Sequence, residues 1–257
     1  MASLWHRELI RFLRQPSRIV GLVAAPLLFW LFFGSGMGAS FQPPSASAGQ
    51  GYLQYFFPGT VVMIVLFTSI FSNMSTIEDR REGFLQSVLV APIPRASLVV
   101  GKILGGATQA MLPGVLFLLL APLVGFRWTF GRAAGAAGIV FLIAVSLTSL
   151  GFAIAWWMDS VQGFHAVLNL LFVPLWLLSG ALFPASGASA WVGWIMQANP
   201  LTYEVAALRA VLSEPSAAAL AGVTPLGLSL QVTVLFCIVS LAVALAWAGR
   251  PTVRHLG

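Results

Sequence analysis

The sequence predicts an all-α integral membrane protein with six transmembrane helices. Hydrophobic residues make up 59% of its 257 residues and charged residues only 8%, and the mean hydropathy is +0.93. A soluble domain of this length could not bury so large an apolar fraction. Charge-free stretches of about 20 residues, the length of a helix that crosses a bilayer, recur along the chain. The net charge of +6 does not indicate nucleic-acid binding, because the basic residues lie at the ends of these stretches.

Residues 1–18 are expected to form a cytoplasmic helix that lies in the membrane interface. On a helical wheel, three arginines share one side and four apolar residues share the other. The arginines are Arg7, Arg11 and Arg14, and the apolar residues are Trp5, Leu9, Phe12 and Leu13. This pattern is typical of a helix with its apolar face in lipid and its arginines near anionic headgroups. Pro16 is expected to end the helix.

The charge-free stretches set the expected positions of the six spans, which together form a single transmembrane domain over residues 1–257. The spans are expected at residues 19–38, 55–77, 98–124, 133–158, 163–183 and 228–247. The apolar segments within residues 184–227 are too short to cross a bilayer. We therefore expect two short re-entrant helices on the extracytoplasmic side.

The distribution of basic residues predicts the orientation in the cell membrane. Ten of the thirteen Lys and Arg residues lie in the N-terminal segment, in residues 78–102 and in the C-terminal tail. By the positive-inside rule these regions face the cytoplasm. Both termini are therefore expected on the cytoplasmic side of the inner membrane.

The segment between the second and third spans, residues 78–97, combines a charge cluster with an apolar run. Its charges follow a stretch with no charged residue from 19 to 77, and they are Glu78, Asp79, Arg80, Arg81 and Glu82. After Gly83, four apolar residues recur at helical spacing, namely Phe84, Leu85, Val88 and Leu89. We expect a short helix from Asp79 to about Val90 that docks onto a soluble cytoplasmic partner. The alternative is a solvated loop that only joins two spans.

The sequence contains no recognisable catalytic or metal-binding motif. Lys102 is the only lysine and follows no glycine-rich loop, so the chain is not expected to hydrolyse ATP. The three histidines are far apart in sequence and do not have metal-ligand spacing. A single cysteine, Cys237, excludes a disulfide framework. We therefore expect no enzyme activity, metal or cofactor in this chain.

A few polar residues fall inside the predicted spans and are candidates for a substrate pathway. These candidates are Asn73, His165 and Asn169. The alternative is that they form hydrogen bonds with neighbouring helices. No Asp, Glu or Arg is expected near the middle of the membrane, which disfavours a proton-driven transporter.

Three blocks of residues follow patterns known from one family of membrane proteins. The first block resembles E-x-x-R-E-G-T-L-x-x-L-x-x-[ST]-P-x-x-R-x-x-x-x-G-K, shifted by at most a residue, at Glu78, Arg81, Glu82, Gly83, Leu85, Leu89, Pro92, Arg95, Gly101 and Lys102. The second resembles S-G-x-x-F-P, a Trp and N-P-L-T-Y-x-x-x-x-x-R, at Ser179, Gly180, Phe183, Pro184, Trp191, Asn199, Pro200, Leu201, Thr202, Tyr203 and Arg209. The third resembles R-[DN]-P, at Arg14, Gln15 and Pro16. Together the three blocks resemble the permease subunits of ABC type-2 exporters, a family that includes daunorubicin-resistance permeases, Nod-factor exporters and polysaccharide exporters.

The resemblance implies a permease that works with separate ATPases. In that family, two permeases form the pathway, two cytoplasmic ATPase subunits bind ATP with Mg²⁺, and the helix between passes two and three is a coupling helix that enters a cleft of the ATPase. The cargo expected from the apolar passes is an amphipathic or lipid-linked molecule, such as a drug, glycolipid or polysaccharide. Phe84 and Gln86 replace the usual Thr and Glu of the family pattern, and Ala91 replaces a common Ser or Thr.

Two other functions fit part of the sequence. An ATP-independent channel or a membrane anchor would share the spans but would need no ATPase. A membrane enzyme would need an essential acidic or histidine side chain, such as Asp159 or His165.

Overall fold

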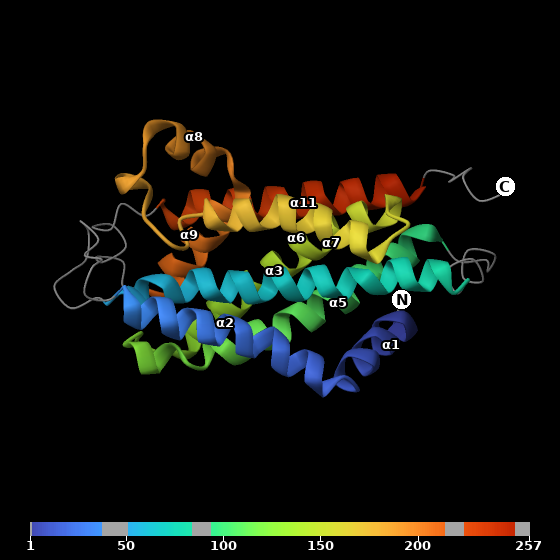
Figure 1. Ribbon diagram of the computed structural model, residues 1–257, viewed down its shortest axis with the longest axis horizontal. Coiled ribbons are helices and arrows are strands. Elements are labelled where there is room, and N and C mark those ends of the chain that lie inside the picture. The colour runs from blue at the N-terminus through green and yellow to red at the C-terminus, as the bar shows by residue number, and fades with distance from the viewer. Residues whose placement is uncertain (1, 38–50, 84–93, 214–223, 250–257) are drawn as a thin grey trace.

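The computed structural model describes residues 2–37, 51–83, 94–213 and 224–249, and the regular structure in these residues is helical throughout (Figure 1). The helices run roughly along one axis, apart from α1 and α8. Their bounds are α1 (Ala2–Leu13), α2 (Pro16–Gly36), α3 (Tyr52–Arg81), α5 (Arg95–Leu118), η1 (Ala121–Val124), α6 (Phe130–Trp157), α7 (Val161–Leu177), η2 (Ala185–Gly187), α8 (Ala190–Ala198), α9 (Pro200–Leu212) and α11 (Leu226–Gly249).

Five helices are long and apolar enough to cross a membrane: α2, α3, α5, α6 and α11. They correspond to the first four predicted spans and the sixth. The fifth span was predicted over residues 163–183, but α7 has only 17 residues, which at ~1.5 Å per residue gives a length of about 26 Å. This is less than the roughly 30 Å of a bilayer core. The chain therefore contains at least five candidate spans, and the arrangement with six stays a prediction.

The early end of α7 has a cause in a distant part of the chain. The side-chain nitrogen of Asn199 donates to the carbonyl oxygens of Leu175 at 2.6 Å and Leu178 at 3.1 Å. Gly180 then turns the chain with a positive φ of 75°. These contacts satisfy carbonyl groups that a continuing helix would otherwise bond.

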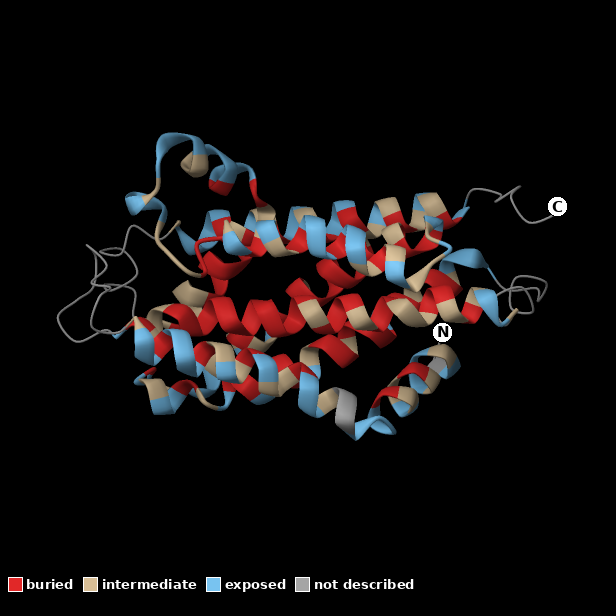
Figure 2. Ribbon diagram, viewed as in Figure 1, coloured by how far each residue is buried: buried red, intermediate tan, exposed pale blue. Residues whose placement is uncertain are grey.

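Helix α3 forms the centre of the bundle. Over its most apolar stretch, 83% of its residues are buried, against 22% in α2 and 28% in α11. Figure 2 shows α3 as an almost continuous buried band between partly exposed helices. Helices α2 and α11 are apolar around most of their circumference, so their exposed faces are suited to lipid or to another protein.

The third predicted span, residues 98–124, is not one helix. Helix α5 ends at Leu118, the short helix η1 follows, and Gly125 closes the turn with a φ of 89°. Pro122 lies in the first turn of η1, where the absence of an N–H is tolerated. The predicted short helices within residues 184–227 are present as α8 and α9.

The prediction that a separate helix begins at Asp79 is wrong, because residues 78–81 form the last turn of α3. The helix ends at Arg81, and Gly83 adopts a left-handed φ of 75° that favours glycine. The predicted partner-binding residues Phe84, Leu85, Val88 and Leu89, together with Pro92, lie outside the described residues. Helix α5 begins directly after Pro94.

Helix α1 meets α2 at an angle and lies at the end of the bundle where α3 and α11 also end (Figure 1). An Arg95 side-chain nitrogen, at the start of α5, donates to the carbonyl oxygen of Gly249, the last residue of α11, at 3.3 Å. The first and last described helices therefore reach the same end of the molecule.

Candidate functional site

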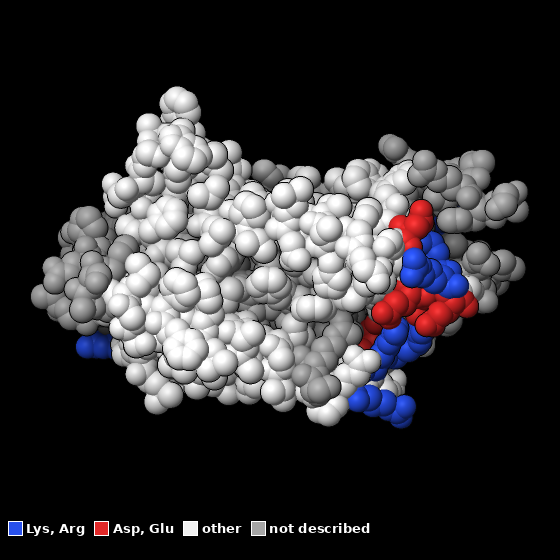
Figure 3. Space-filling view, in the orientation of Figure 1, with Lys and Arg blue, Asp and Glu red and all other residues white. Residues whose placement is uncertain are grey.

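Charged side chains gather at one end of the molecule, whereas most of the remaining face in view carries none (Figure 3). Three helices contribute three cations and three anions, which we call the charge cluster. Its members are Arg7, Glu8 and Arg11 of α1, Glu78 and Asp79 of α3, and Lys102 of α5. Residues far apart in sequence thus meet beside the end of α3.

The centre of the cluster is buried. The Lys102 side chain is 3% exposed, that of Glu8 is 4% exposed and that of Asp79 is not exposed. The Lys102 ammonium donates to Glu8 Oε1 at 2.7 Å and to Asp79 Oδ2. Two anions therefore share one lysine, which leaves a net negative charge that a second cation must balance.

Arg7 supplies that second cation. Its two terminal nitrogens donate to Asp79 Oδ2 at 3.1 Å and to Asp79 Oδ1 at 2.9 Å. This two-point geometry is the strong form of an arginine–carboxylate contact. The hydrogen bond to Asp79 raises the pKa of the Arg7 guanidinium. The four groups together are neutral, which buried charges require.

A more exposed ion pair lies beside this buried centre. Arg11 donates to Glu78 Oε2 at 2.6 Å, and the two side chains are 33% and 38% exposed. Exposed pairs of this kind contribute about 0.2–1 kcal/mol. The buried centre, not this pair, therefore fixes the position of α1.

Close packing of α1 on α5 supports the cluster. A Cβ atom at Gly105 would lie 2.9 Å from Glu8 Cβ, so a larger residue there would push α1 outward. The Gln109 side-chain nitrogen donates to the Glu8 carbonyl oxygen at 3.0 Å. The Trp5 indole nitrogen donates to Thr108 Oγ1 at 3.0 Å. Helix α1 is thus held along its length by α5.

The prediction that the arginines of the first helix face lipid headgroups is wrong for Arg7 and Arg11, which face the carboxylates of α3. Glu8 was overlooked as a site residue. Its signal was present in the sequence, because Glu8 lies four residues from both Leu4 and Phe12 and therefore shares their helix face. Leu13, placed on the lipid face, is 56% exposed and consistent with that placement.

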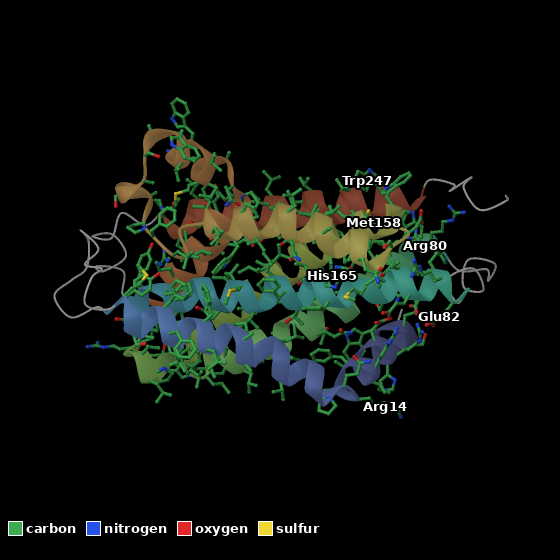
Figure 4. All side chains as sticks on the ribbon, in the orientation of Figure 1. Arg14, Arg80, Glu82, Met158, His165 and Trp247 are labelled. Carbon is green, nitrogen blue, oxygen red and sulfur yellow. The ribbon has the colours of Figure 1, made fainter. Side chains whose placement is uncertain are left out.

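The opposite side of the α3 end is attached to α6. The Arg80 guanidinium donates to the carbonyl oxygens of Trp156 at 2.5 Å, Ala155 at 3.0 Å and Met158. Arg81 Nε donates to the Asp159 carbonyl oxygen at 3.0 Å. Figure 4 shows Arg80 beside Met158 at this end. The two arginines thus satisfy carbonyl groups at and just beyond the end of α6.

These contacts change the roles available to the predicted partner-binding residues. Asp79 is fully buried and its carboxylate is occupied within the chain, so it offers no surface to a partner. Glu78 and Arg80 are partly buried and bonded internally. Arg81 and Glu82 are exposed and lie next to Gly83. A partner-binding role for them stays a prediction.

The second block of motif residues lies apart from the charge cluster, in α9 and in the connection that precedes it. Asn199 Oδ1 accepts from the Leu201 N–H at 3.0 Å and so caps α9, with Pro200 as its first residue. The Tyr203 hydroxyl donates to the Gln197 carbonyl oxygen at 2.9 Å. Pro184 precedes η2. These residues shape the connection between α7 and α9.

Arg209 joins this connection to α3. Its Nη2 donates to the carbonyl oxygens of Gly180 at 3.0 Å and Tyr55 at 3.3 Å. The guanidinium lies 4.3 Å from the centre of the Tyr55 ring.

The other motif residues Gly101 and Arg95 lie in α5, where Gly101 is buried and Arg95 is exposed.

The three candidate pathway residues have different surroundings. The Asn73 side-chain nitrogen donates to the carbonyl oxygens of Ser69 at 2.9 Å and Thr148 at 3.2 Å, so it joins α3 to α6. His165 is partly buried against the Phe71 ring, with ring centres 5.4 Å apart. Asn169 is exposed on α7. Across the described ranges, no group of three His, Cys, Asp or Glu side chains is placed to hold a metal ion.

Comparison with known proteins places these features in a family. The family described as ABC-2 type transporter matches residues 1–213. A "Putative transport permease ycf38" of Cyanophora paradoxa is 27% identical over 215 residues, covering 82% of this chain and 73% of that protein. "Daunorubicin resistance ABC transporter permease protein DrrB1" of Streptomyces coeruleorubidus is 23% identical over 219 residues, covering 82% and 74%. "Inner membrane transport permease YadH" of Escherichia coli K12 is 23% identical over 216 residues, covering 81% of each chain.

Proposed function

Since the chain belongs to the ABC-2 type transporter family, we propose that it is the membrane-spanning permease subunit of an exporter powered by a separate cytoplasmic ATPase. Its similar relatives are transport permeases and not enzymes. ATP with Mg²⁺ would bind to the ATPase and not to this chain.

One observation carries the coupling part of the proposal: the end of α3 is held on two sides just before residues 84–93. The charge cluster joins it to α1 and α5, and Arg80 joins it to α6. A movement of residues 84–93 would therefore be passed to several helices together. A coupling segment needs such an attachment to transmit the closure of an ATPase pair.

The proposed orientation places the charge cluster and both termini in the cytoplasm, at the inner membrane. It is supported by the excess of basic residues at that end, and by the name of the similar inner membrane permease. A second copy of this chain would complete the pathway. The exposed apolar faces of α2 and α11 are surfaces that a bilayer or that copy could cover.

The proposed cargo is an amphipathic or lipid-linked molecule that leaves the cytoplasm. Support comes from the apolar composition of the spans and from the daunorubicin-resistance permease among the similar proteins. A drug, a glycolipid and a polysaccharide on a lipid carrier all belong to this class. The substrate-contact roles of Asn73, His165 and Asn169 belong to the proposal.

Co-purification with the ATPase tests the proposal. Phe84→Asp and Leu85→Asp are expected to abolish co-purification and ATP-dependent export, because a charge would enter the proposed contact. Phe130→Asp is a matched control, since Phe130 is 91% exposed at the start of α6, at the far end of the bundle. The Phe130→Asp variant should retain both co-purification with the ATPase and ATP-dependent export. Export that continues without ATP, or ATPase binding unchanged by Phe84→Asp, would favour a channel or an anchor instead.

A further inference from the structure

Glu204 of α9 is a fully buried acidic residue in the middle of the bundle. Its Oε1 lies 2.7 Å from Ser146 Oγ. Ser146 is the seventeenth of the 28 residues of α6 and so lies close to the midpoint of that helix. The sequence predicts no acidic residue near the middle of the membrane, whereas Glu204 lies beside the midpoint of a candidate span.

No cation compensates Glu204 in the described part of the chain. Glu204 forms no ion pair with a described residue, in contrast to the acids of the charge cluster. Arg209 lies on the same helix, but its guanidinium faces Tyr55 and Gly180. Glu204 Oε2 has no hydrogen-bond partner. An ionised carboxylate is strongly disfavoured in such a place, and a bound proton removes the charge.

The hydrogen bonds of Ser146 point to the same state. Its hydroxyl lies 2.9 Å from the Ile143 carbonyl oxygen and 2.7 Å from Glu204 Oε1. A serine hydroxyl has one proton and can donate to only one of these oxygens. Both contacts are satisfied when Ser146 donates to Ile143 and Glu204 donates its own proton to Ser146. That arrangement requires the neutral acid.

The helices around Glu204 contain other buried polar atoms that lack a partner. Within the described ranges, the five buried side-chain polar atoms that lack a partner all lie on α6, α9 or α11. They include the hydroxyls of Ser149 on α6 and Ser240 on α11. Each unsatisfied polar group of this kind opposes burial.

We propose that Glu204 is a proton-binding site, which holds a proton while α9 packs against α6 and α11 and releases it when they separate. On separation, the O–H bond of Glu204 breaks, the proton passes to water and a carboxylate remains. On repacking, the carboxylate takes a proton from water. If the proposed function also holds, each transport cycle that opens this interface releases and rebinds a proton.

The titratable groups around α9 are few. Cys237 of α11 lies close enough to interact electrostatically with Glu204. Tyr55 of α3 packs on Arg209. On α9 itself, the Tyr203 hydroxyl is bonded to Gln197. On α7, His165 packs on Phe71. Cys237 and His165 are therefore the positions for the control variants.

Infrared spectroscopy of the full chain in lipid nanodiscs tests the protonation state directly. The wild-type protein at neutral pH is expected to show the carbonyl stretch of a protonated carboxylic acid, and Glu204→Gln is expected to lose it. A pH titration of this band in the wild type needs no variant. An ionised Glu204 at neutral pH would overturn the proposal.

Thermal unfolding as a function of pH tests the link to packing. A folded acid that keeps a proton which the unfolded chain loses makes the protein less stable as pH rises above the ordinary pKa of a glutamate. The wild-type Tm should therefore fall as the pH rises above this value, and the fall should be smaller in Glu204→Gln. His165→Gln and Cys237→Ser should keep the wild-type slope. An equal slope in Glu204→Gln would contradict the proposal.

Export from vesicles tests the transport cycle and rests on the proposed function. Glu204→Gln is expected to change the pH profile of ATP-dependent export, and His165→Gln to leave it unchanged. The infrared and unfolding measurements need neither the ATPase nor a cargo. They would therefore remain informative if the chain proved not to be an exporter.

Discussion

Asp79 and Glu204 are both completely buried acids, but they have different neighbours. Asp79 contacts Arg7 and Lys102, and a second acid, Glu8, shares the lysine. Glu204 contacts one serine and no cation within the described residues. The first acid lies at the end of the bundle and the second in its middle.

The difference shows two ways of keeping a carboxylic acid inside an apolar bundle. Paired charges require exact geometry, so they hold three helices in one arrangement. A protonated acid requires no partner of fixed position, so the helix that carries it can move away once the proton leaves. We therefore expect the end of α3 to be rigid and α9 to be the movable part.

Removal of the shared lysine should have the largest effect on this comparison. Lys102→Met would leave Glu8 and Asp79 buried with one cation between them, and should cost about 3–5 kcal/mol of unfolding free energy. Chemical unfolding in detergent micelles measures the loss. Arg95→Met, an exposed change in the same helix, should stay within about 0.5 kcal/mol. Similar losses in the two variants would show that the cluster does not hold α1.

A change in the packing below the cluster should have the next largest effect. Gly105→Val would place atoms against Glu8 and should destabilise the protein by about 1–3 kcal/mol. Trp5 fluorescence should report the displacement of α1. Gly138→Val, at a helix position with no atom within 4 Å of the added Cβ, is the control. An unchanged Trp5 signal in Gly105→Val would contradict the close contact.

The same substitution at both acidic sites sharpens the comparison most directly. Glu8→Gln removes a charge that pairs with Lys102 and should cost about 1–3 kcal/mol. Glu204→Gln resembles the protonated acid and should change stability by less than about 1 kcal/mol at neutral pH. Unfolding of both variants under one condition gives the difference. A larger loss in Glu204→Gln would mean that Glu204 is ionised.

The exposed pair should give the smallest effect. In a double-mutant cycle with Arg11→Ala and Glu78→Ala, the coupling free energy should be about 0.2–1 kcal/mol. It should fall as salt is raised, because solvent screens exposed charges. The cost of Lys102→Met should depend much less on salt. A coupling free energy that does not change with salt would mean that the Arg11–Glu78 pair is buried like the centre of the cluster.

Much of the helical framework could be predicted from the sequence, because a charge-free apolar stretch of about 20 residues is typical of a helix that crosses a bilayer. The ends of the helices were harder. Polar residues 78–81 continue α3 because Arg7, Arg11 and the end of α6 satisfy them from more than 60 residues away. Likewise, α7 stops at Leu177 because Asn199 binds its last carbonyl groups. The residues next to a helix end in the sequence do not show which distant residues will bind it.

The burial of Glu204 was also not predicted from the sequence. It lies on a helix that is too short to cross a bilayer and was predicted to be re-entrant, and α9 packs along α6 and places the acid beside the midpoint of that helix. A signal was available, since Leu201, Ala207 and Leu208 surround Glu204 at helical spacing. An acid with apolar residues one turn away on either side indicates burial even in a short helix.

The capping of α6 by Arg80 has a mechanical consequence. A torque applied at Gly83 would reach α6 through three carbonyl contacts and α1 through the Arg7 guanidinium, so these helix ends would tilt as one body. Spin labels on the exposed residues Ser3 and Trp157 would then keep a constant separation through the working cycle. A label on α9 would move relative to both.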